Sequence, residues 1–294
     1  MMKMMGKAVC CLLLCAALLT SAARGETAVR GVNHRGYSAA APENTLPAFA
    51  LSWEMGFRYV ETDVSFTKDN VAVLLHDAAI NRTARGADGG DLRGERSILI
   101  NEITYEEALA YDFGVWMGEE YRGTKLPTFA EFLDLCAELG LRPYIELKDG
   151  GNYTREQIDG LVAAVREKGL QRQATWISFS YEYLKWVRDR DESARLGYLC
   201  MLWSSADDFR ADIQKALDLR NGSNDVFLDT SFRFIRFVEG GSPELYISLC
   251  REAGVPLETW TVDSEEEMRA LDPYITGVTS NTLRYEDYYR DAQR

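Results

Sequence analysis

Short runs rich in β-branched and aromatic residues alternate with longer stretches of helical periodicity along most of this chain. After residue 142 the alternation is regular. The runs expected to form strands there are 143–147, 175–179, 195–199, 226–229, 257–262 and 275–279, and the helices expected between them are 155–168, 181–188, 207–219, 243–253 and 264–271. Strands separated by helices imply right-handed crossover connections and a parallel sheet.

The first part of the chain adds two strands to this set. We expect them at 29–34 and 59–65, with a helix at 43–55 between them. Eight parallel strands can close into a barrel. The alternative is an open doubly wound sheet, but no Gly-rich dinucleotide-binding turn follows the run at 29–34. The sequence therefore predicts an α/β fold of the TIM (β/α)₈ barrel type.

One stretch interrupts the rhythm. An extended run at 71–76 is followed by residues 77–125, which are rich in Gly, Arg and Asp and contain one expected short helix, 104–111. The regular pattern resumes with a helix at 128–139. A connection of this length in a compact domain is usually functional. We therefore expect an insertion after strand two that forms a cap or wall over the carboxyl ends of the barrel strands.

The N-terminal segment differs in composition from the rest of the chain. Lys3 and Lys7 precede the apolar run 8–19. Ser21 and Ala23 follow it with the small-x-small spacing that a signal peptidase reads. The run is shorter than the about 20 apolar residues that span a bilayer. We expect 1–23 to be a signal peptide, with an uncleaved N-terminal anchor as the alternative, and 24–294 to be a single domain. The protein would then be secreted or extracytoplasmic, meeting a membrane through an uncleaved leader if at all.

Charge limits the partners of the chain. The formal net charge is −13, and it becomes −15 once the two leader lysines are removed. A polyanion such as nucleic acid would be repelled by that field. A small anionic substrate therefore needs a local positive element, and a bound cation would supply one.

Carboxylates gather at the ends of two consecutive barrel strands. Glu61 and Asp63 lie two residues apart near the end of the second strand, and Glu146 and Lys148 have the same spacing at the end of the next. Residues two apart in a strand point to the same face, and barrel enzymes build their sites at the carboxyl ends of strands. Three converging carboxylates repel one another unless a charge neutralises them. An oxygen-rich, sulfur-free set suits a hard divalent cation, Mg²⁺ or Ca²⁺, which can hold a phosphoryl oxygen.

Both histidines of the chain end an extended run close to these acids. His34 ends the run at 29–34, and His76 ends the run at 71–76. With a cation they can break a P–O bond, because one imidazole can take a proton from the attacking hydroxyl while the other gives one to the leaving alkoxide. A single histidine or a single acid pair is most often structural. The interpretation rests on the conjunction of both histidines and three acids at neighbouring strand ends.

The motifs, in this order, resemble the glycerophosphodiester phosphodiesterase family over about residues 29–282. The first half of the match is highly specific. The residues that carry it are His34-Arg35-Gly36, Pro42-Glu43-Asn44-Thr45, Glu61-Thr62-Asp63, Val73-Leu74-Leu75-His76-Asp77, Asn81-Arg82-Thr83, Pro127-Thr128 and Ile145-Glu146-Leu147-Lys148, with weaker matches at Ile177-Ser178-Phe179-Ser180 and Thr259-Trp260-Thr261-Val262-Asp263.

The resemblance implies hydrolysis of a small-molecule glycerophosphodiester to glycerol 3-phosphate and an alcohol, with the neighbouring hydroxyl of the substrate as one conceivable nucleophile. It also implies a barrel with an insertion after strand two. The site residues it implies are His34 and His76 as the acid–base pair, Glu61, Asp63 and Glu146 as metal ligands, Arg35 and Lys148 at the phosphate with Glu43 nearby, and Phe179 and Trp260 along the alcohol side or in the core. Which histidine is the base stays open.

Two segments depart from the family pattern. The family commonly has Thr-Asp near the end of the last strand, where this chain has Thr279-Ser280-Asn281, and Ala84-Arg85-Gly86 is also off pattern. Both are expected at the rim of the site. We therefore expect them to affect substrate choice more than the chemistry.

Two other functions stay open. A phospholipase-D-like or phosphoinositide-type barrel enzyme would act on intact lipids and would expose apolar loop residues, for which Phe113, Trp116 and Met117 are candidates. A non-catalytic phosphodiester-binding module would lack a ligand or a histidine, and none is missing; fold alone does not secure function. The sequence leaves the head group and the oligomeric state undetermined.

Overall fold

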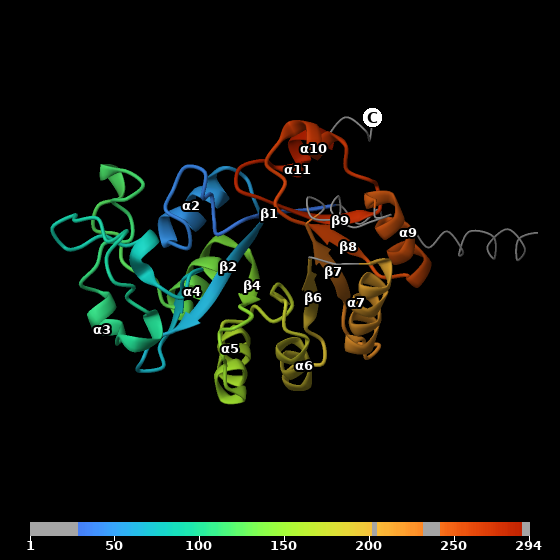
Figure 1. Ribbon diagram of the computed structural model, residues 1–294, viewed down its shortest axis with the longest axis horizontal. Helices are drawn as coiled ribbons and strands as arrows, with labels where there is room; N and C mark the ends of the chain where they lie inside the picture. The colour runs from blue at the N-terminus through green and yellow to red at the C-terminus, as the bar shows by residue number, and fades with distance from the viewer. Residues whose placement is uncertain (1–28, 202–204, 232–241, 290–294) are drawn as a thin grey trace, which may run out of the picture.

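The computed structural model describes residues 29–201, 205–231 and 242–289 (Figure 1). The predicted leader, 1–23, lies outside the described residues, so the expectation of export or anchoring stays a prediction. Among the helices of the described residues, none combines the length and the apolar composition that crossing a bilayer requires.

Eight parallel strands form a closed ring. Each strand pairs with its neighbours in order, and β1 pairs with both β2 and β9, which closes the barrel. The strands are β1 (Arg30–Asn33), β2 (Tyr59–Phe66), β4 (Arg142–Leu147), β5 (Thr175–Ser178), β6 (Arg195–Cys200), β7 (Val226–Thr230), β8 (Leu257–Thr259) and β9 (Ile275–Ser280). The predicted (β/α)₈ barrel is confirmed.

Helices lie around the outside of the strands (Figure 1). They are α2 (Leu46–Glu54), α4 (Phe129–Leu139), α5 (Arg155–Glu167), α6 (Tyr181–Arg190), α7 (Ala206–Leu219), α9 (Pro243–Ala253), α10 (Glu265–Arg269) and α11 (Tyr285–Tyr289). Their ends follow local signals. Thr128 begins α4 in a capping box with Glu131, and Gly140 ends it with a φ of 68°.

The helix predicted at 43–55 begins later than expected, and the reason lies in the site. Asn44 has a φ of 56°, in the left-handed region, and Thr45 is the extended residue before α2. The chain therefore turns at 43–45 before the helix starts. This turn carries the Glu43 and Asn44 side chains to the carboxyl ends of β1 and β2.

The insertion begins earlier than the expected 77–125. After β2 the chain turns back at 67–70 and forms β3 (Ala72–Leu74), which pairs antiparallel with β2 outside the ring. Short helices follow: η1 (Ile80–Arg82), η2 (Ile100–Glu102), α3 (Tyr105–Ala108) and η3 (Glu119–Tyr121). The insertion is a lobe at the left of Figure 1 with an apolar cluster of its own, made of Val73, Leu75, Ile80, Ala84, Ile100, Ala108, Phe113 and Leu126.

The barrel interior is packed in its middle and polar at its amino end. Val32, Tyr144, Ile177, Leu199 and Phe227 form an apolar cluster inside the ring. Near the start of β6, the Arg195 guanidinium lies 2.6 Å from the buried Glu258 carboxylate. Ion pairing closes this end, so a small molecule can reach the interior from the carboxyl end of the strands, where barrel enzymes bind substrate.

Replacing Gly197 with alanine tests the packing of this interior. A Cβ at this position would overlap the Phe227 ring and lie 2.8 Å from Ile177 Cγ2. We expect the free energy of unfolding to fall by about 1–3 kcal/mol, because close-packed side chains cannot move aside freely.

Gly160→Ala is the matched control, because no atom outside its own helix α5 lies within 4 Å of the added Cβ. We expect this variant to gain up to about 1 kcal/mol from helix propensity. Urea unfolding measures both variants, and equal stability of the two would contradict the packing argument.

Candidate active site

Three acidic side chains meet at the carboxyl end of β2 and β4. Glu61 and Asp63 come from β2, and Glu146 comes from β4, where it pairs in register with Asp63. All three are buried, and one carboxylate oxygen of each lies within 4.8 Å of the others. The predicted convergence of the three acids is therefore present in the structure.

The cluster has the electrostatics of a cation site. Burial, with Asp63 and Glu146 nearby, raises the pKa of Glu61 well above its usual value. Burial and Asp63 raise the pKa of Glu146 to about 7. Burial alone would also raise the pKa of Asp63, but Lys148 and Arg35 outweigh it and hold that pKa well below its usual range.

One oxygen of the cluster supports the same conclusion. Glu61 Oε1 is buried and has no hydrogen-bond partner among the described residues. An unpaired buried carboxylate oxygen is costly, and a cation would offset that cost. Oxygen ligands without sulfur or nitrogen fit a hard divalent ion. The buried triad can therefore hold a divalent cation.

Two cations of the protein lie against the acidic cluster. Lys148 Nζ is 3.0 Å from Asp63 Oδ1 and 2.9 Å from Glu146 Oε1. Arg35 Nε is 3.3 Å from Asp63 Oδ2, and the Arg35 backbone N–H donates to Glu61 Oε2 at 2.9 Å. Both side chains also line the cavity described below. They lie where the resemblance to the family predicts phosphate contacts.

The turn after β1 presents these groups. Arg35 and Gly36 both have positive φ, 57° and 76°. A Cβ at Gly36 would lie 2.7 Å from the carbonyl carbon of Ala48 in α2. Glycine is therefore required in this turn, both for its backbone conformation and for the close approach of the helix.

Asn44 holds the central acid, although no individual role was predicted for it. Its Nδ2 donates to Asp63 Oδ2 at 2.8 Å, while its Oδ1 accepts from Thr62 Oγ1 at 2.9 Å and from the Asp63 backbone N–H at 3.2 Å. Asn44 is 3% exposed, so water does not compete for these hydrogen bonds. The available signal was its position in the Pro42-Glu43-Asn44-Thr45 motif.

His34 lies on one side of the cluster, held by a chain of polar contacts. Its Nε2 is 3.9 Å from Glu61 Oε2, and its Nδ1 is 2.8 Å from Asn281 Oδ1. Asn281 Nδ2 donates to Asp263 Oδ2 at 2.6 Å, and Ser38 Oγ donates to Asn281 Oδ1 at 2.9 Å. Burial and the nearby Arg35 lower the pKa of His34 to about 4.

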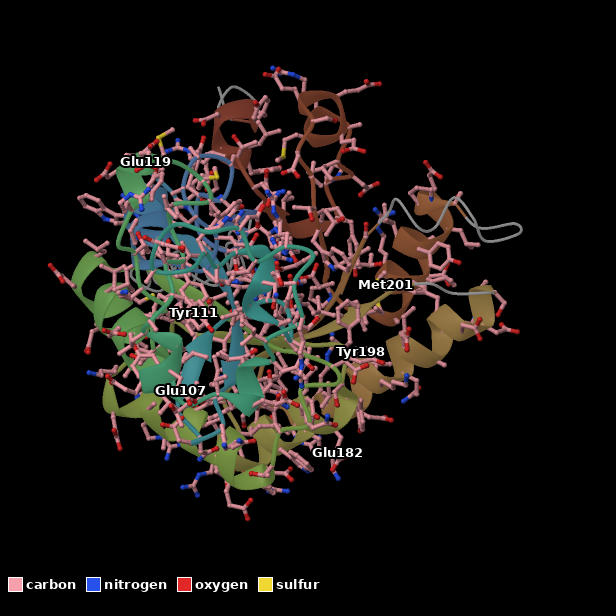
Figure 2. The ribbon with its side chains drawn as sticks, turned by 60° about the vertical axis from the view of Figure 1, so that its left-hand side comes forward. Glu107, Tyr111, Glu119, Glu182, Tyr198 and Met201 are labelled. Carbon is pink, nitrogen blue, oxygen red and sulfur yellow. The ribbon has the colours of Figure 1, made fainter. Side chains whose placement is uncertain are left out.

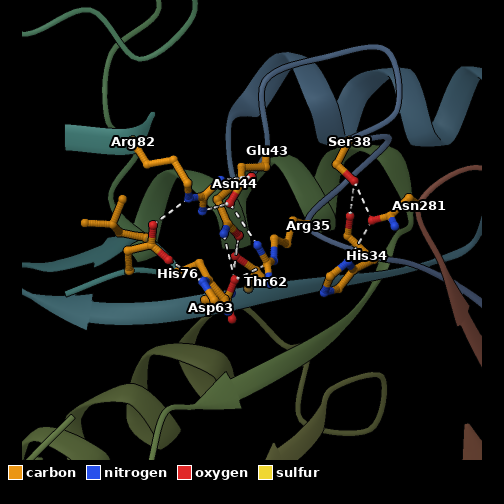
Figure 3. A network of polar contacts seen from close by, with 12 residues as sticks. His34, Arg35, Ser38, Glu43, Asn44, Thr62, Asp63, His76, Arg82 and Asn281 are labelled. Atoms are coloured by element: carbon orange, nitrogen blue, oxygen red, sulfur yellow. Dashed lines mark hydrogen bonds and ion pairs between the residues drawn. The ribbon is translucent and has the colours of Figure 1, made fainter. Parts of the chain in front are cut away.

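Asn281 belongs to the segment that departs from the family pattern. We expected the departure at Thr279-Ser280-Asn281 to affect substrate choice more than the chemistry, and this stays a prediction. Asn281 contacts the His34 imidazole directly (Figure 3). It sits 247 positions from His34 in the chain, and the closure of the barrel between β9 and β1 brings the two together.

His76 lies on the other side and is held by the insertion. Its Nδ1 is 2.6 Å from Asp77 Oδ1, and Arg82 Nε donates to Asp77 Oδ2 at 2.5 Å. Arg82 also donates two hydrogen bonds of 2.7 Å to Glu43, whose Oε1 accepts from Arg35 at 3.0 Å. Figure 3 shows this line of contacts from His76 to Arg35.

Glu43 was predicted as a substrate-binding residue, and in the structure its neighbours are two arginines. Its carboxylate faces Arg35 and Arg82 and is 12% exposed. Those two arginines hold its pKa below the usual value against the opposing effect of burial. The geometry places Glu43 behind Arg35, and direct contact with substrate stays a prediction.

One cavity of about 260 Å³ collects the predicted site residues. Its polar half is lined by His34, Arg35, Glu61, His76, Glu146 and Lys148, and its apolar half by Ile177, Phe179, Leu199, Met201 and Trp260. Phe179 and Trp260 meet edge to face with ring centroids 5.9 Å apart. Asp63 lies beneath this lining, fully buried. In Figure 2 the insertion, which carries Tyr111, faces the viewer, and Met201, the residue after β6, lies to its right.

The acidic cluster predicts a pH-dependent stabilisation by metal. With chelator, the raised pKa of Glu146 stabilises the fold while the carboxyl is protonated, and this contribution is lost as pH rises from about 4.5 to its pKa of about 7. A divalent cation favours the ionised form. We therefore expect Mg²⁺ or Ca²⁺ to raise the thermal unfolding midpoint more at about pH 8 than at about pH 5.

Circular dichroism melts with chelator and with each ion measure this difference. Glu146→Gln is expected to shrink the shift at the higher pH. A shift of equal size at both pH values in the wild type would contradict a cation bound by these carboxylates.

Known proteins share both the sequence and the fold. The model of the glycerophosphoryl diester phosphodiesterase family matches residues 34–283. A glycerophosphodiester phosphodiesterase of Caldanaerobacter subterraneus subsp. tengcongensis is 29% identical over 245 residues, which are 82% of this chain and 88% of that protein.

Solved structures agree. A candidate glycerophosphoryl diester phosphodiesterase of Silicibacter pomeroyi superposes with a TM-score of 0.74 at 26% identity, covering 90% of this chain and 94% of that one. An Oleispira antarctica phosphodiesterase, solved with its product sn-glycerol-3-phosphate, has a TM-score of 0.66 at 23% identity, covering 90% of this chain and 97% of that one, and shows the fold. The predicted family and enzyme class are confirmed: this chain belongs to the glycerophosphoryl diester phosphodiesterase family.

Proposed function

We propose that this enzyme hydrolyses glycerophosphodiesters to glycerol 3-phosphate and an alcohol, using a divalent cation and two histidines. The observation that carries the proposal is the single cavity in which His34 and His76 flank a buried carboxylate triad. The relative from Caldanaerobacter, a glycerophosphodiester phosphodiesterase, supports the substrate class. The product bound to the Oleispira phosphodiesterase supports glycerol 3-phosphate as the product here.

The cation would be Mg²⁺ or Ca²⁺, held by Glu61, Asp63 and Glu146. When bound it supplies a positive charge that draws electron density from a phosphoryl oxygen and stabilises charge developing there. Arg35 and Lys148 are then the protein groups that contact the remaining phosphate oxygens. Their contacts with Asp63 keep both side chains extended towards the cluster.

The partner of His34 suits a general base. Asp263 accepts from the Asn281 amide nitrogen, so the amide oxygen faces His34 and can only accept. His34 Nδ1 must therefore carry the proton, which leaves the Nε2 lone pair free on the side of the cluster. The low pKa of about 4 keeps the ring neutral near pH 7.

The partner of His76 suits a general acid. Burial, with Lys148 and Arg35, lowers the pKa of His76, but Asp77 is a carboxylate and opposes this effect, because a carboxylate favours the protonated imidazole more than an amide does. His34 Nε2 would take a proton from the attacking water molecule as the new O–P bond forms. His76 would give its proton to the alcohol oxygen as the old P–O bond breaks, and proton exchange with water restores both rings.

The described insertion does not favour an enzyme of intact lipids. Phe113 is buried in its apolar cluster, and Trp116 and Met117 are partly buried. The exposed large apolar residues within the described ranges are Trp53 and Met55 on and next to α2. A cavity of about 260 Å³ suits a small alcohol better than acyl chains. The non-catalytic alternative has no support, since both histidines and all three acids line or underlie one cavity.

We propose an extracytoplasmic location, with a small-molecule substrate and no nucleic acid partner. The support is the leader predicted at 1–23 and the net charge of −13.

Product release tests the proposed reaction. Wild-type enzyme with Mg²⁺ or Ca²⁺ is expected to release glycerol 3-phosphate from glycerophosphodiesters, and excess chelator is expected to abolish the release. His34→Ala is expected to lower kcat by about 10²-fold or more, because it removes the proton acceptor. Coupled oxidation of glycerol 3-phosphate measures each rate. Turnover that survives both chelation and the substitution would exclude the mechanism.

Substrates with different leaving groups distinguish the roles of the two histidines. An acid is needed to release a poor leaving group such as an alkoxide, but not an activated phenolate. We expect His76→Ala to lower kcat by about 10²-fold with an alkyl glycerophosphodiester and far less with a nitrophenyl one. His34→Ala should harm both substrates alike. The opposite pattern would exchange the two roles.

A further inference from the structure

A buried carboxyl group that does not belong to the acidic triad lies on the cavity wall. Asp229 on β7 lines the cavity and is 1% exposed. Its Oδ1 is buried and has no hydrogen-bond partner among the described residues. The proposed mechanism gives this group no role, yet burying it without a partner costs free energy.

Asp229 lies between the ion-paired Glu258, its register partner on β8, and the apolar and aromatic side of the cavity lining. Phe227 and Asp229, two apart on β7, both point into the barrel. The same half of the cavity carries Ile177, Leu199 and the edge-to-face pair of Phe179 and Trp260. The indole nitrogen of Trp260 is also buried without a partner within the described part of the chain. This half therefore offers apolar surface and aromatic rings around one acid.

The two protein cations of the cavity lining lie beside the acidic triad. They are Arg35 and Lys148, next to the place proposed for phosphate. Burial, together with Glu258 and against the effect of Arg195, raises the pKa of Asp229 well above its usual value. A cation beside the carboxyl would reverse this effect, because an opposite charge favours the ionised form. A ligand with an anionic phosphate and a nearby cation would match both halves.

We propose that the apolar half of the cavity binds an alcohol that carries an ammonium group, with Asp229 as its anionic partner. This inference rests on the proposed function and names the head group that the sequence left open. Asp229 supplies the opposite charge, and the rings of Phe179 and Trp260 supply the surface that stabilises organic cations. An ammonium group also provides the hydrogen-bond donor that Asp229 Oδ1 lacks, provided that it is a primary amine.

Three diesters test the head group on the wild-type enzyme. We expect glycerophosphoethanolamine and glycerophosphocholine to exceed glycerophosphoglycerol in kcat/KM by about tenfold or more, because the neutral alcohol leaves Asp229 without a charged partner. A preference for ethanolamine over choline would identify the hydrogen bond as the main contact. The reverse would identify the aromatic surface, and either order supports an ammonium site.

Asp229→Asn tests the residue. The substitution keeps the size of the side chain and removes its charge, so the ratio of kcat/KM between ammonium and neutral substrates is expected to fall by about tenfold. Asp112→Asn is the matched control. Asp112 is another buried aspartate, but it lies in the insertion, accepts hydrogen bonds from the backbone N–H groups of Gly114 and Gly123 and does not line the cavity, so the ratio should stay at the wild-type value.

The outcomes separate this inference from the proposed function. If none of the three diesters is hydrolysed, the proposed function fails. If all three are hydrolysed with equal kcat/KM, or if Asp229→Asn lowers every rate by the same factor, the ammonium site alone is overturned. Should the variant not fold, competitive inhibition of the wild type by free ethanolamine but not by ethylene glycol decides, and equal inhibition by the two overturns the site.

Discussion

Mutual repulsion among three buried carboxylates determines which charged groups this structure places around them. Glu61, Asp63 and Glu146 are brought together by the pairing of β2 with β4, and burial makes their charges more costly than they would be in water. Two cationic side chains of the protein, Lys148 and Arg35, partly offset this repulsion. Their charges favour the ionised form of Asp63 above all, so part of the negative charge is left for a divalent ion to neutralise.

The groups around the cluster are organised to hold it in place. Asn44, in the turn before α2, donates a hydrogen bond to Asp63. The left-handed turn at Arg35 and Gly36 presents a backbone N–H to Glu61. Each histidine is then held by a different kind of partner, an amide for His34 and a carboxylate for His76. The difference between these partners gives two chemically equal side chains unequal proton affinities, as the proposed acid and base roles require.

Much of this arrangement could be predicted from the sequence, for clear physical reasons. The alternation of strands and helices dictates a parallel barrel, and the period of two along a strand places Glu61 with Asp63 and Glu146 with Lys148. Contacts between distant segments could not be predicted. The pairing of His34 with Asn281 depends on the closure of the barrel, and the unpaired state of Asp229 depends on the register of β7. The predicted start of the insertion was late because Ala72–Leu74 has the composition of a strand whether it lies inside or outside the ring.

Arg82 joins the insertion to the barrel beside the site, in addition to the pairing of β3 with β2. It belongs to the insertion, which has its own apolar cluster, yet it donates two hydrogen bonds to Glu43 beside the barrel helix α2. The outer lobe could therefore change in length or surface during evolution with little effect on the chemistry, as long as His76, Asp77 and Arg82 keep their positions. A chimaera that took its lobe from a relative would need an arginine in the place of Arg82, or Glu43 would lose the guanidinium that holds it on the side away from Arg35.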